Sequence, residues 1–220
     1  MPLPNKTYAA FLFDMDGTLI NSIASANRVW TRWAESHGLD PVAVLRVMHG
    51  VRAVETIRRL NVPGMDVEYE AAALTQAEID DIDGIVPIKG AVELLQDLPP
   101  ERWAIATSAP RELAVKRLAA AGIPQPRAFI TADDVTQGKP APDCFAMAAR
   151  QLDVRTSECL VWEDSIAGVQ AAVAAGSDVM VISATHEKRL ETEHPVIVDY
   201  ERVSVVVDDS GRLALTSRAI

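Results

Sequence analysis

Short apolar runs alternate with amphipathic helical patterns over most of this chain. The runs are short and continuously apolar, as expected for strands of a parallel sheet that is covered on both faces. They are Tyr8–Phe13, Trp103–Thr107, Ala128–Thr131, Cys159–Trp162 and Val179–Ile182. The helical patterns that accompany them are Val92–Leu98, Arg111–Ala121, Asp143–Leu152 and Ile166–Ala175. Because parallel strands need crossover helices, this order predicts an α/β fold with a Rossmann-like parallel sheet.

The alternation is interrupted once, directly after the first strand. Residues 21–86 carry only helical periodicity, with Ile23, Trp30 and Ala34 marking one face of the first helix. A purely helical block at this position predicts a small domain inserted over the carboxyl edge of the sheet. We therefore expect a sheet-containing core of residues 1–19 and 87–220 and an inserted helical domain of residues 20–86. Near the end of the chain, two alternating runs around Gly211 predict a hairpin.

The negative net charge of the chain argues against nucleic acid and anionic membranes as partners. The chain of 220 residues has 21 basic and 31 acidic residues and a net charge of −10, which repels nucleic acid and anionic membranes. No apolar window of about 18 residues and no signal peptide are present, so we expect a cytoplasmic protein. We also expect a monomer or weak dimer. The two cysteines, Cys144 and Cys159, lie in apolar surroundings and are expected to be reduced.

The inserted block is electrically lopsided. Its second half, from Asn61 to Ile88, has seven acidic residues and neither Lys nor Arg, whereas its first half is rich in arginine. Most of these charges are expected on solvated faces, and only the first half is suited to meet an anionic substrate.

Two carboxylates follow the first strand, in the string Asp14-Met15-Asp16-Gly17-Thr18. Open α/β sheets bind their ligands at this edge, where the strands end. A calcium-binding loop can begin with a similar string, but it requires Glu at its twelfth position, and here that position is Ser25. The string therefore favours a catalytic or metal-binding role at the sheet edge.

Three later strands end in complementary chemistry. Thr107 and Ser108 offer a hydroxyl and backbone N–H groups, Lys139 lies in a loop, and Glu163-Asp164 end another strand. Each alone is commonplace: a helix cap, a solvated lysine or a surface acid pair. Together with Asp14 and Asp16 they predict one site.

At these residues the chain resembles the haloacid dehalogenase superfamily, in its phosphatase branch with a helical cap. The resemblance covers nearly the whole chain. The family's four motifs match Phe11 to Thr18, then Thr107, then Lys139, then Glu163 with Asp164. Three further stretches, Trp103–Ser108, Phe129–Pro140 and His49–Arg52, look closer to a subgroup of sugar, 2-deoxyglucose-6-phosphate and glycerol-phosphate phosphatases. Asn21 and Ala109-Pro110 depart from the commoner family residues, and Ala109-Pro110 lacks the side-chain hydroxyl often found there.

The resemblance implies a role for each matched residue. Asp14 would be the nucleophile that forms an aspartyl phosphate, and Asp16 the general acid and then base. Thr107, Ser108 and Lys139 would bind the transferring phosphoryl group. The implied cofactor is Mg²⁺, held by Asp14, the Asp16 backbone carbonyl, Asp164 and Glu163. In the cap, His49, Gly50, Arg52 and Glu78 are the candidate substrate-binding residues.

The same superfamily contains other chemistries. Dehalogenases lack the second carboxylate of the first motif, and phosphonatases need a cap lysine, whereas no lysine lies between Lys6 and Lys89. The preferred prediction is an Mg²⁺-dependent phosphatase of a small sugar, sugar-alcohol or glycerol phosphate. A phosphosugar mutase resembling β-phosphoglucomutase is the alternative, although Arg52 is the one obvious cation of the cap. A non-catalytic phosphosugar-binding module is a second alternative.

Overall fold

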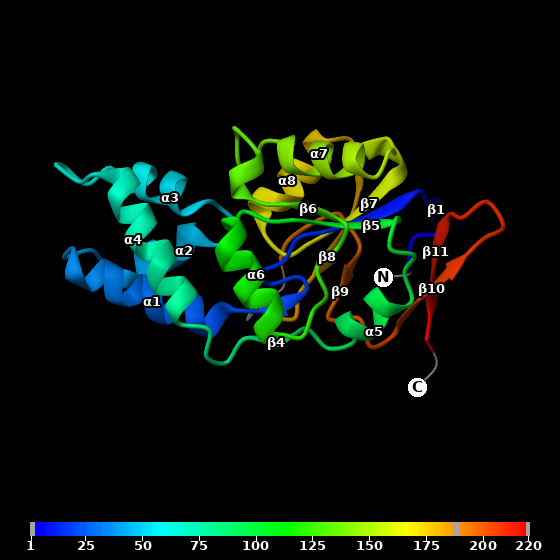
Figure 1. Ribbon diagram of the computed structural model, residues 1–220, viewed down its shortest axis with the longest axis horizontal. Helices are drawn as coiled ribbons and strands as arrows, with labels where there is room; N and C mark the ends of the chain where they lie inside the picture. The colour runs from blue at the N-terminus through cyan, green and yellow to red at the C-terminus, as the bar shows by residue number, and fades with distance from the viewer. Residues whose placement is uncertain (1–2, 187–189, 219–220) are drawn as a thin grey trace.

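The core of the protein is a six-stranded parallel sheet in the order β6-β5-β2-β7-β8-β9. The computed structural model describes residues 3–186 and 190–218 (Figure 1). The strands are β2 (Ala10–Phe13), β5 (Trp103–Ala106), β6 (Ala128–Ile130), β7 (Cys159–Glu163), β8 (Asp178–Ile182) and β9 (Val196–Ile197). The predicted α/β class and parallel sheet are confirmed, and the two-residue β9 is an addition that no apolar run indicated.

Alternate residues of the central strand β2 face two separate apolar layers. Phe11 and Phe13 join one cluster, and Ala10 and Leu12 join the other, as the two-residue period of a strand requires. The helices α5 (Ala91–Gln96) and α6 (Arg111–Ala120) cover the first face, and α7 (Asp143–Gln151) and α8 (Ile166–Ala174) cover the second. Two short 3-10 turns, Ala132–Asp134 and Thr156–Glu158, connect these layers. The sheet is therefore buried on both faces, as its continuously apolar strands predict.

An aromatic stack fixes the ends of the two central strands. The Phe13 ring lies on that of Trp162 with centroids 5.6 Å apart and an interplanar angle of 16°. Just beyond the stack, the backbone N–H of Asp14 donates to the Trp162 carbonyl at 2.9 Å. Asp14 and Glu163 each follow one of the stacked residues, so the packing of two buried rings positions two carboxylates.

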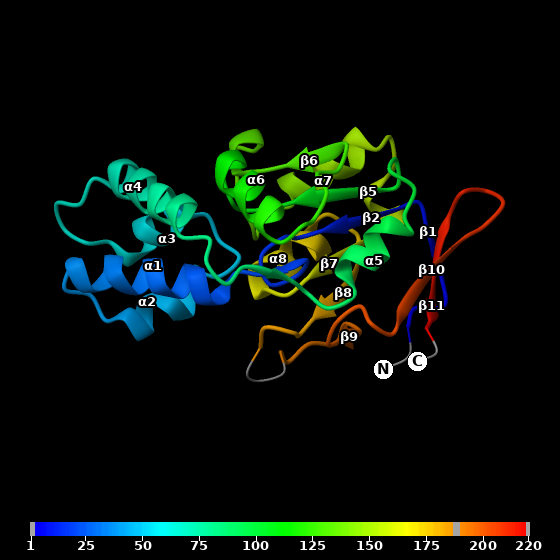
Figure 2. The same cartoon turned by 60° about the horizontal axis from the view of Figure 1, so that its bottom comes forward.

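Residues between the first core strand and α5 form four helices with their own apolar cluster. They are α1 (Ile23–Ser36), α2 (Pro41–Met48), α3 (Ala53–Leu60) and α4 (Val67–Asp80). Trp30, Trp33 and Leu74 belong to this separate cluster, and both views show the four helices gathered beside one end of the sheet (Figures 1 and 2). Where the chain enters and leaves these helices, β3 (Ile20–Asn21) and β4 (Val86–Pro87) pair antiparallel. The expectation of purely helical structure is therefore wrong at the two ends of the insert.

The opposite charges of the cap halves pair with each other. Asp81 forms ion pairs with Arg28 at 2.5 Å and Arg32 at 3.0 Å, and Glu68 forms one with Arg58 at 2.9 Å. Most of these side chains are exposed, so solvent screens the attraction and each pair adds little to stability. The lopsided charge of the insert thus has a structural explanation, the joining of α1 to the end of α4 and of α3 to its start.

A second, antiparallel sheet of three strands joins the two ends of the chain. It has the order β1 (Thr7–Tyr8), β11 (Leu213–Ser217) and β10 (Val203–Val207). The predicted hairpin is present, with Gly211 at φ 75° in its turn, and β1 adds a strand that was not expected. Cys144 and Cys159 are both free and buried. Among the described residues, no helix has the length and apolar character needed to cross a membrane.

Candidate active site

Three buried carboxylates meet at the carboxyl ends of β2 and β7. Asp14, Glu163 and Asp164 each offer an oxygen, and these oxygens all lie within 4.8 Å of one another. The two strands are neighbours in the sheet, so the residues that follow them are brought together by strand pairing. Three carboxylates cannot share so small a buried space without positive charge to stabilise them.

Lys139 supplies part of that charge. It comes from the loop between β6 and α7, and its Nζ donates to Asp14 Oδ1 at 2.5 Å and to Glu163 Oε1 at 2.7 Å. Its side chain is only 1% exposed. Although burial alone would lower it, the pKa of Lys139 is raised by Asp14 and Glu163, so the ammonium stays charged. Removing either partner would leave an uncompensated buried charge.

Burial raises the pKa of two of the three carboxylates, Asp14 and Asp164. Complete burial raises the pKa of Asp14 well above its usual value; Lys139 opposes this shift, and the charges of Glu163 and Asp164 add to it. Burial also raises the pKa of Asp164 to about 6, although His186 acts in the opposite direction. The imidazole Nε2 of His186 lies 3.7 Å from Asp164 Oδ2, a contact that no sequence pattern indicated. A further cation at this cluster would therefore stabilise the ionised forms of the carboxylates.

Glu163 is the most firmly held of the three. Its Oε2 accepts from the backbone N–H groups of Asp164 and Ser165, both at 2.8 Å, and from Ser165 Oγ at 3.0 Å. A Cβ on Gly168 of α8 would lie 1.6 Å from Glu163 Oε1, so only glycine fits there. With both oxygens engaged, Glu163 orients Lys139 and contributes charge.

The donor set fits a magnesium ion. It consists of carboxylate oxygens, with neither a Cys nor a His among the three clustered residues, and hard oxygen ligands suit Mg²⁺ rather than zinc. Gly17 allows the turn that brings them together: its φ is +89°, and a Cβ would lie 2.0 Å from Asp164 Oδ2. Gly17 of the first motif thus leaves the space that Asp164 occupies.

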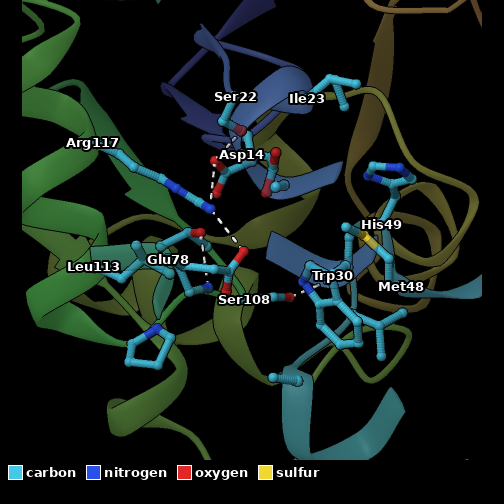
Figure 3. Close-up of a pocket in the computed structure, with 18 of the residues that line it drawn as sticks. Asp14, Ser22, Ile23, Trp30, Met48, His49, Glu78, Ser108, Leu113 and Arg117 are labelled. Atoms are coloured by element: carbon cyan, nitrogen blue, oxygen red, sulfur yellow. Dashed lines mark hydrogen bonds and ion pairs between the residues drawn. The ribbon is translucent and has the colours of Figure 1, made fainter. Parts of the chain in front are cut away.

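Asp16 lies apart from this cluster, on the side of the helical cap. Its Oδ1 accepts from Ser22 Oγ at 2.5 Å and from Arg117 Nη1 at 3.0 Å. Arg117 comes from α6 of the core, and its Nη2 also donates to Glu78 Oε1 of α4 at 2.8 Å. Figure 3 shows its side chain reaching from α6 toward Glu78, with Ser22 beyond. The guanidinium therefore joins the first motif to the cap.

Arg117 was not indicated by the motifs. It is only 4% exposed, and it shares the buried face of α6 with Leu113, Ala114 and Leu118. Burial opposes its charge, but Asp16 and Glu78 raise the pKa of Arg117 above its usual value. Arg117 lies three and four residues after the apolar Ala114 and Leu113, and a charge at this helical spacing is the sequence signal that could have identified it.

The phosphate-binding candidates lie at the end of β5. Thr107 Oγ1 accepts from the Ala109 backbone N–H at 3.1 Å, which fixes the turn after the strand. Ser108 Oγ donates to the Gly50 carbonyl at 2.9 Å and thereby ties the core to the loop after α2. A Cβ on Gly50 would also lie 2.3 Å from Ser165 Oγ. The loop of the cap is thus seated between two loops of the core.

A cavity of about 80 Å³ lies between the cap and the sheet edge. Of the predicted residues, it is lined by Asp14, Asp16, Thr107, Ser108, Asp164, His49, Gly50 and Glu78. Trp30 lies beside it with His49 (Figure 3). Burial lowers the pKa of His49; Asp16 acts in the opposite direction and His186 in the same one.

Arg52 is not brought into this cavity. Its Nε donates to Glu55 Oε1 at 2.9 Å, and its guanidinium donates to the carbonyls of Val135 at 3.3 Å and Thr136 at 3.0 Å. Those carbonyls belong to the loop that leads to Lys139. The described contacts of Arg52 therefore join the cap to the core rather than line the place where a substrate would lie.

A parallel sheet with an inserted helical domain and an acidic cluster at its carboxyl edge defines a class, the capped Rossmann-like hydrolases. Residues 8–176 match the model of the haloacid dehalogenase-like hydrolases, and the chain belongs to this family. The family predicted from the sequence is thereby confirmed.

Named relatives extend the comparison. Hexitol phosphatase A of Escherichia coli is 36% identical over 206 residues, covering 91% of this chain and 95% of the relative. Glycerol-1-phosphate phosphohydrolase 2 of Saccharomyces cerevisiae is 34% identical over 197 residues, covering 84% and 78%. A crystal structure of a hydrolase from Pseudomonas syringae superposes with a TM-score of 0.72 at 28% identity, covering 80% of this chain and 85% of that one. The family match over residues 8–176 includes both the helical insert and most of the sheet.

Proposed function

We propose that this chain is an Mg²⁺-dependent phosphatase that hydrolyses a small sugar, sugar-alcohol or glycerol phosphate through an aspartyl phosphate on Asp14. The observation that carries the proposal is the placement of a carboxylate at a strand end, 2.5 Å from a buried lysine and beside two further acids. The named relatives, a hexitol phosphatase and a glycerol-1-phosphate phosphohydrolase, support the substrate class.

The reaction takes place in two displacements at phosphorus. An Asp14 oxygen forms a bond to phosphorus while the bond from phosphorus to the ester oxygen breaks, and Asp16 gives its proton to the departing alkoxide. Water then attacks the phosphorus of the aspartyl phosphate and loses a proton to Asp16. Phosphate leaves, and both carboxyl groups return to their starting states.

Charge and hydrogen bonding to the transferring group come from three residues. The Lys139 ammonium lies beside Asp14 and stabilises negative charge on the phosphoryl oxygens. The Thr107 hydroxyl and the Ser108 backbone N–H, at the end of the neighbouring strand, donate to the remaining oxygens. These groups are fixed by the sheet before substrate binds, so little reorganisation is needed during the reaction.

Mg²⁺ would be held by the carboxylates of Asp14 and Asp164 and the backbone carbonyl of Asp16, with Glu163 contacting it through water. When bound, the ion supplies positive charge that offsets the repulsion between Asp14 and a phosphate dianion, about 4 kcal/mol per unit charge at 4 Å and an effective dielectric of 20. The raised pKa of Asp14 is the feature of this chain that creates the need, because a nucleophilic carboxylate must be ionised.

The cap supplies the rest of the pocket. We assign His49, Gly50 and Glu78, which line the cavity, to the leaving group, and Arg52 to docking of the cap on the core. The cavity of about 80 Å³ is smaller than the roughly 300–1,000 Å³ typical of ligand pockets. Substrate entry therefore requires the cap to open, and the paired β3 and β4 are the segments about which it would turn.

The test is phosphate release from a panel of hexitol, hexose and glycerol phosphates, with Mg²⁺ or with EDTA. We expect release from some of the panel, loss of release in EDTA, and loss of release by Asp14→Asn on every substrate. Lys116→Gln, at an exposed position of α6, is the control and should behave as wild type. Release that persists in Asp14→Asn would overturn the proposal.

A further inference from the structure

Arg117 and Glu78 line the cavity next to Asp16. Arg117 Nη1 lies 3.0 Å from the oxygen of Asp16, the proposed proton donor to the departing oxygen, and Nη2 lies 2.8 Å from Glu78. A leaving group whose first oxygen is at Asp16 therefore extends along the guanidinium toward Glu78. Both side chains line the cavity, one from the core and one from the cap.

We propose that Arg117 and Glu78 form the subsite that binds the hydroxyl groups of the leaving group, and that their charges select uncharged polyols over leaving groups with a second anionic group. This inference rests on the proposed phosphatase function. It adds a core residue, Arg117, to a pocket that the motifs attributed to the cap alone.

The chemistry of the pair matches a hydroxyl. A hydroxyl group both donates and accepts, so it can donate to the Glu78 carboxylate while it accepts from the Arg117 guanidinium. Trp30 adds an apolar surface beside the pair (Figure 3).

The charge of the pair disfavours a second phosphate. The guanidinium contacts both Asp16 and Glu78. With Asp16 holding the proton that it gives to the leaving group, the charges of Arg117 and Glu78 cancel, so the pair offers no excess positive charge to a second anion. Arg117 is 5% exposed and Glu78 is 8% exposed at the side chain, so solvent screens these charges little. A second phosphoryl or carboxylate group would face Glu78 with no unshared cation from this pair. The bisphosphate that a phosphosugar mutase must retain is disfavoured for the same reason.

The experiment measures kcat/KM for three substrates: glycerol 1-phosphate, propyl phosphate, which has the same chain length and an equally basic leaving group but no further hydroxyl groups, and fructose 1,6-bisphosphate. The variants are Arg117→Gln and Glu78→Gln, and Lys116→Gln is the control on the same helix. Arg117→Gln should lower kcat/KM for glycerol 1-phosphate about tenfold more than for propyl phosphate. Glu78→Gln, which keeps the shape of the side chain, should raise the ratio of bisphosphate to glycerol 1-phosphate activity about tenfold.

The outcomes separate this inference from the proposed function. Equal changes on all three substrates in both variants would mean that the pair is only structural and would overturn the inference while the phosphatase stands. A wild-type preference for the bisphosphate would also overturn it. No phosphate release by wild type from any substrate would overturn the proposed function and, with it, this inference. If Arg117→Gln fails to fold, Glu78→Gln alone decides: an unchanged ratio of bisphosphate to glycerol 1-phosphate activity would overturn the charge selection.

Discussion

At the scale of single residues, the site depends on small groups that make room for charged ones. Gly17 and Gly168 each lie where a Cβ would overlap a carboxylate, at 2.0 Å from Asp164 and 1.6 Å from Glu163. Both carboxylates are almost fully buried, so neither has space into which to move. The acidic cluster therefore depends on glycine at both positions, because any other residue would overlap Asp164 or Glu163.

Gly168→Ala tests this packing. In an ordinary helix the exchange would stabilise by about 1 kcal/mol, but here the new methyl group must displace Glu163 from Lys139. We expect the free energy of unfolding to fall by about 1–3 kcal/mol and phosphatase activity to fall with it. The measurements are urea denaturation and phosphate release. The reverse exchange at the neighbouring position, Ala167→Gly, lowers helix propensity without touching Glu163, and should retain activity. A stabilised, fully active Gly168→Ala would show that the cluster tolerates a side chain there.

Residue types at strand ends made much of the site predictable. Asp14 and Asp164 could be anticipated because parallel strands place the residues that follow them at one edge. His186 could not, because the position of its loop depends on tertiary packing. Arg117 was marked only as a charge among the apolar positions of its helix, which does not indicate its partners. Arg52 shows the opposite problem: its place in the cap loop suggested a substrate contact, but backbone carbonyls of a core loop occupy its donors.

At the scale of elements, the turn after β6 shapes the loop that carries Lys139. Asp134 accepts from the backbone N–H and the hydroxyl of Thr131, both at 2.8 Å, and from Arg111 at 2.7 Å. Partial burial would raise the pKa of Asp134, but these hydrogen bonds outweigh it and lower the pKa below the usual value. The folded chain thus stabilises the ionised form of Asp134 more than its protonated form.

The sign of the pH dependence follows. A carboxyl whose pKa is lowered on folding stabilises the fold above its unfolded pKa, near 3.9, and this stability is lost as the pH falls through the folded pKa. Asp134→Ala should therefore lower the free energy of unfolding by about 1–2 kcal/mol at pH 7, with the difference from wild type shrinking below about pH 4. Urea denaturation at both pH values measures it, with the exposed Glu101→Ala as control. If the difference in the free energy of unfolding between Asp134→Ala and wild type were the same at both pH values, the stabilisation by Asp134 would not depend on its charge.

Strand and helix order could be anticipated because the strands of a sheet covered on both faces are continuously apolar. The linkers of the cap could not, because β3 and β4 have two residues each and lie at opposite ends of the four-helix insert. Two residues are too few to show a period, so no pattern in the sequence distinguishes such a ladder from a loop.

At the scale of the whole molecule, the cap and the core meet over a site that combines strong negative charge with a single buried lysine. Ser108 holds the Gly50 carbonyl, Arg52 holds a core loop, and Arg117 joins Asp16 to Glu78. These three contacts span the cavity from different directions. Binding of a cation at the acidic cluster should stabilise the folded chain as a whole, because the unfolded chain has no such cluster.

Thermal melting with Mg²⁺ tests that expectation. A ligand at about 100 times its Kd stabilises the folded state by about 2.7 kcal/mol, which for a chain of this size raises Tm by about 5–10 °C. Asp164→Asn removes one carboxylate of the cluster and should abolish most of the rise. Asp209→Asn, an exposed acid in the distant hairpin, should retain it. An equal rise in both variants would place the ion elsewhere.

The proposed mechanism requires that Asp14 become phosphorylated during turnover, and acid quenching can trap that intermediate. The enzyme is mixed with Mg²⁺ and a hexitol or glycerol phosphate, quenched in acid while turning over, digested with pepsin and analysed by mass spectrometry. We expect one added phosphoryl group on the peptide that contains Asp14, and none in Asp14→Asn. A phosphoryl group on another residue, or turnover by Asp14→Asn without any phosphorylated peptide, would contradict the mechanism.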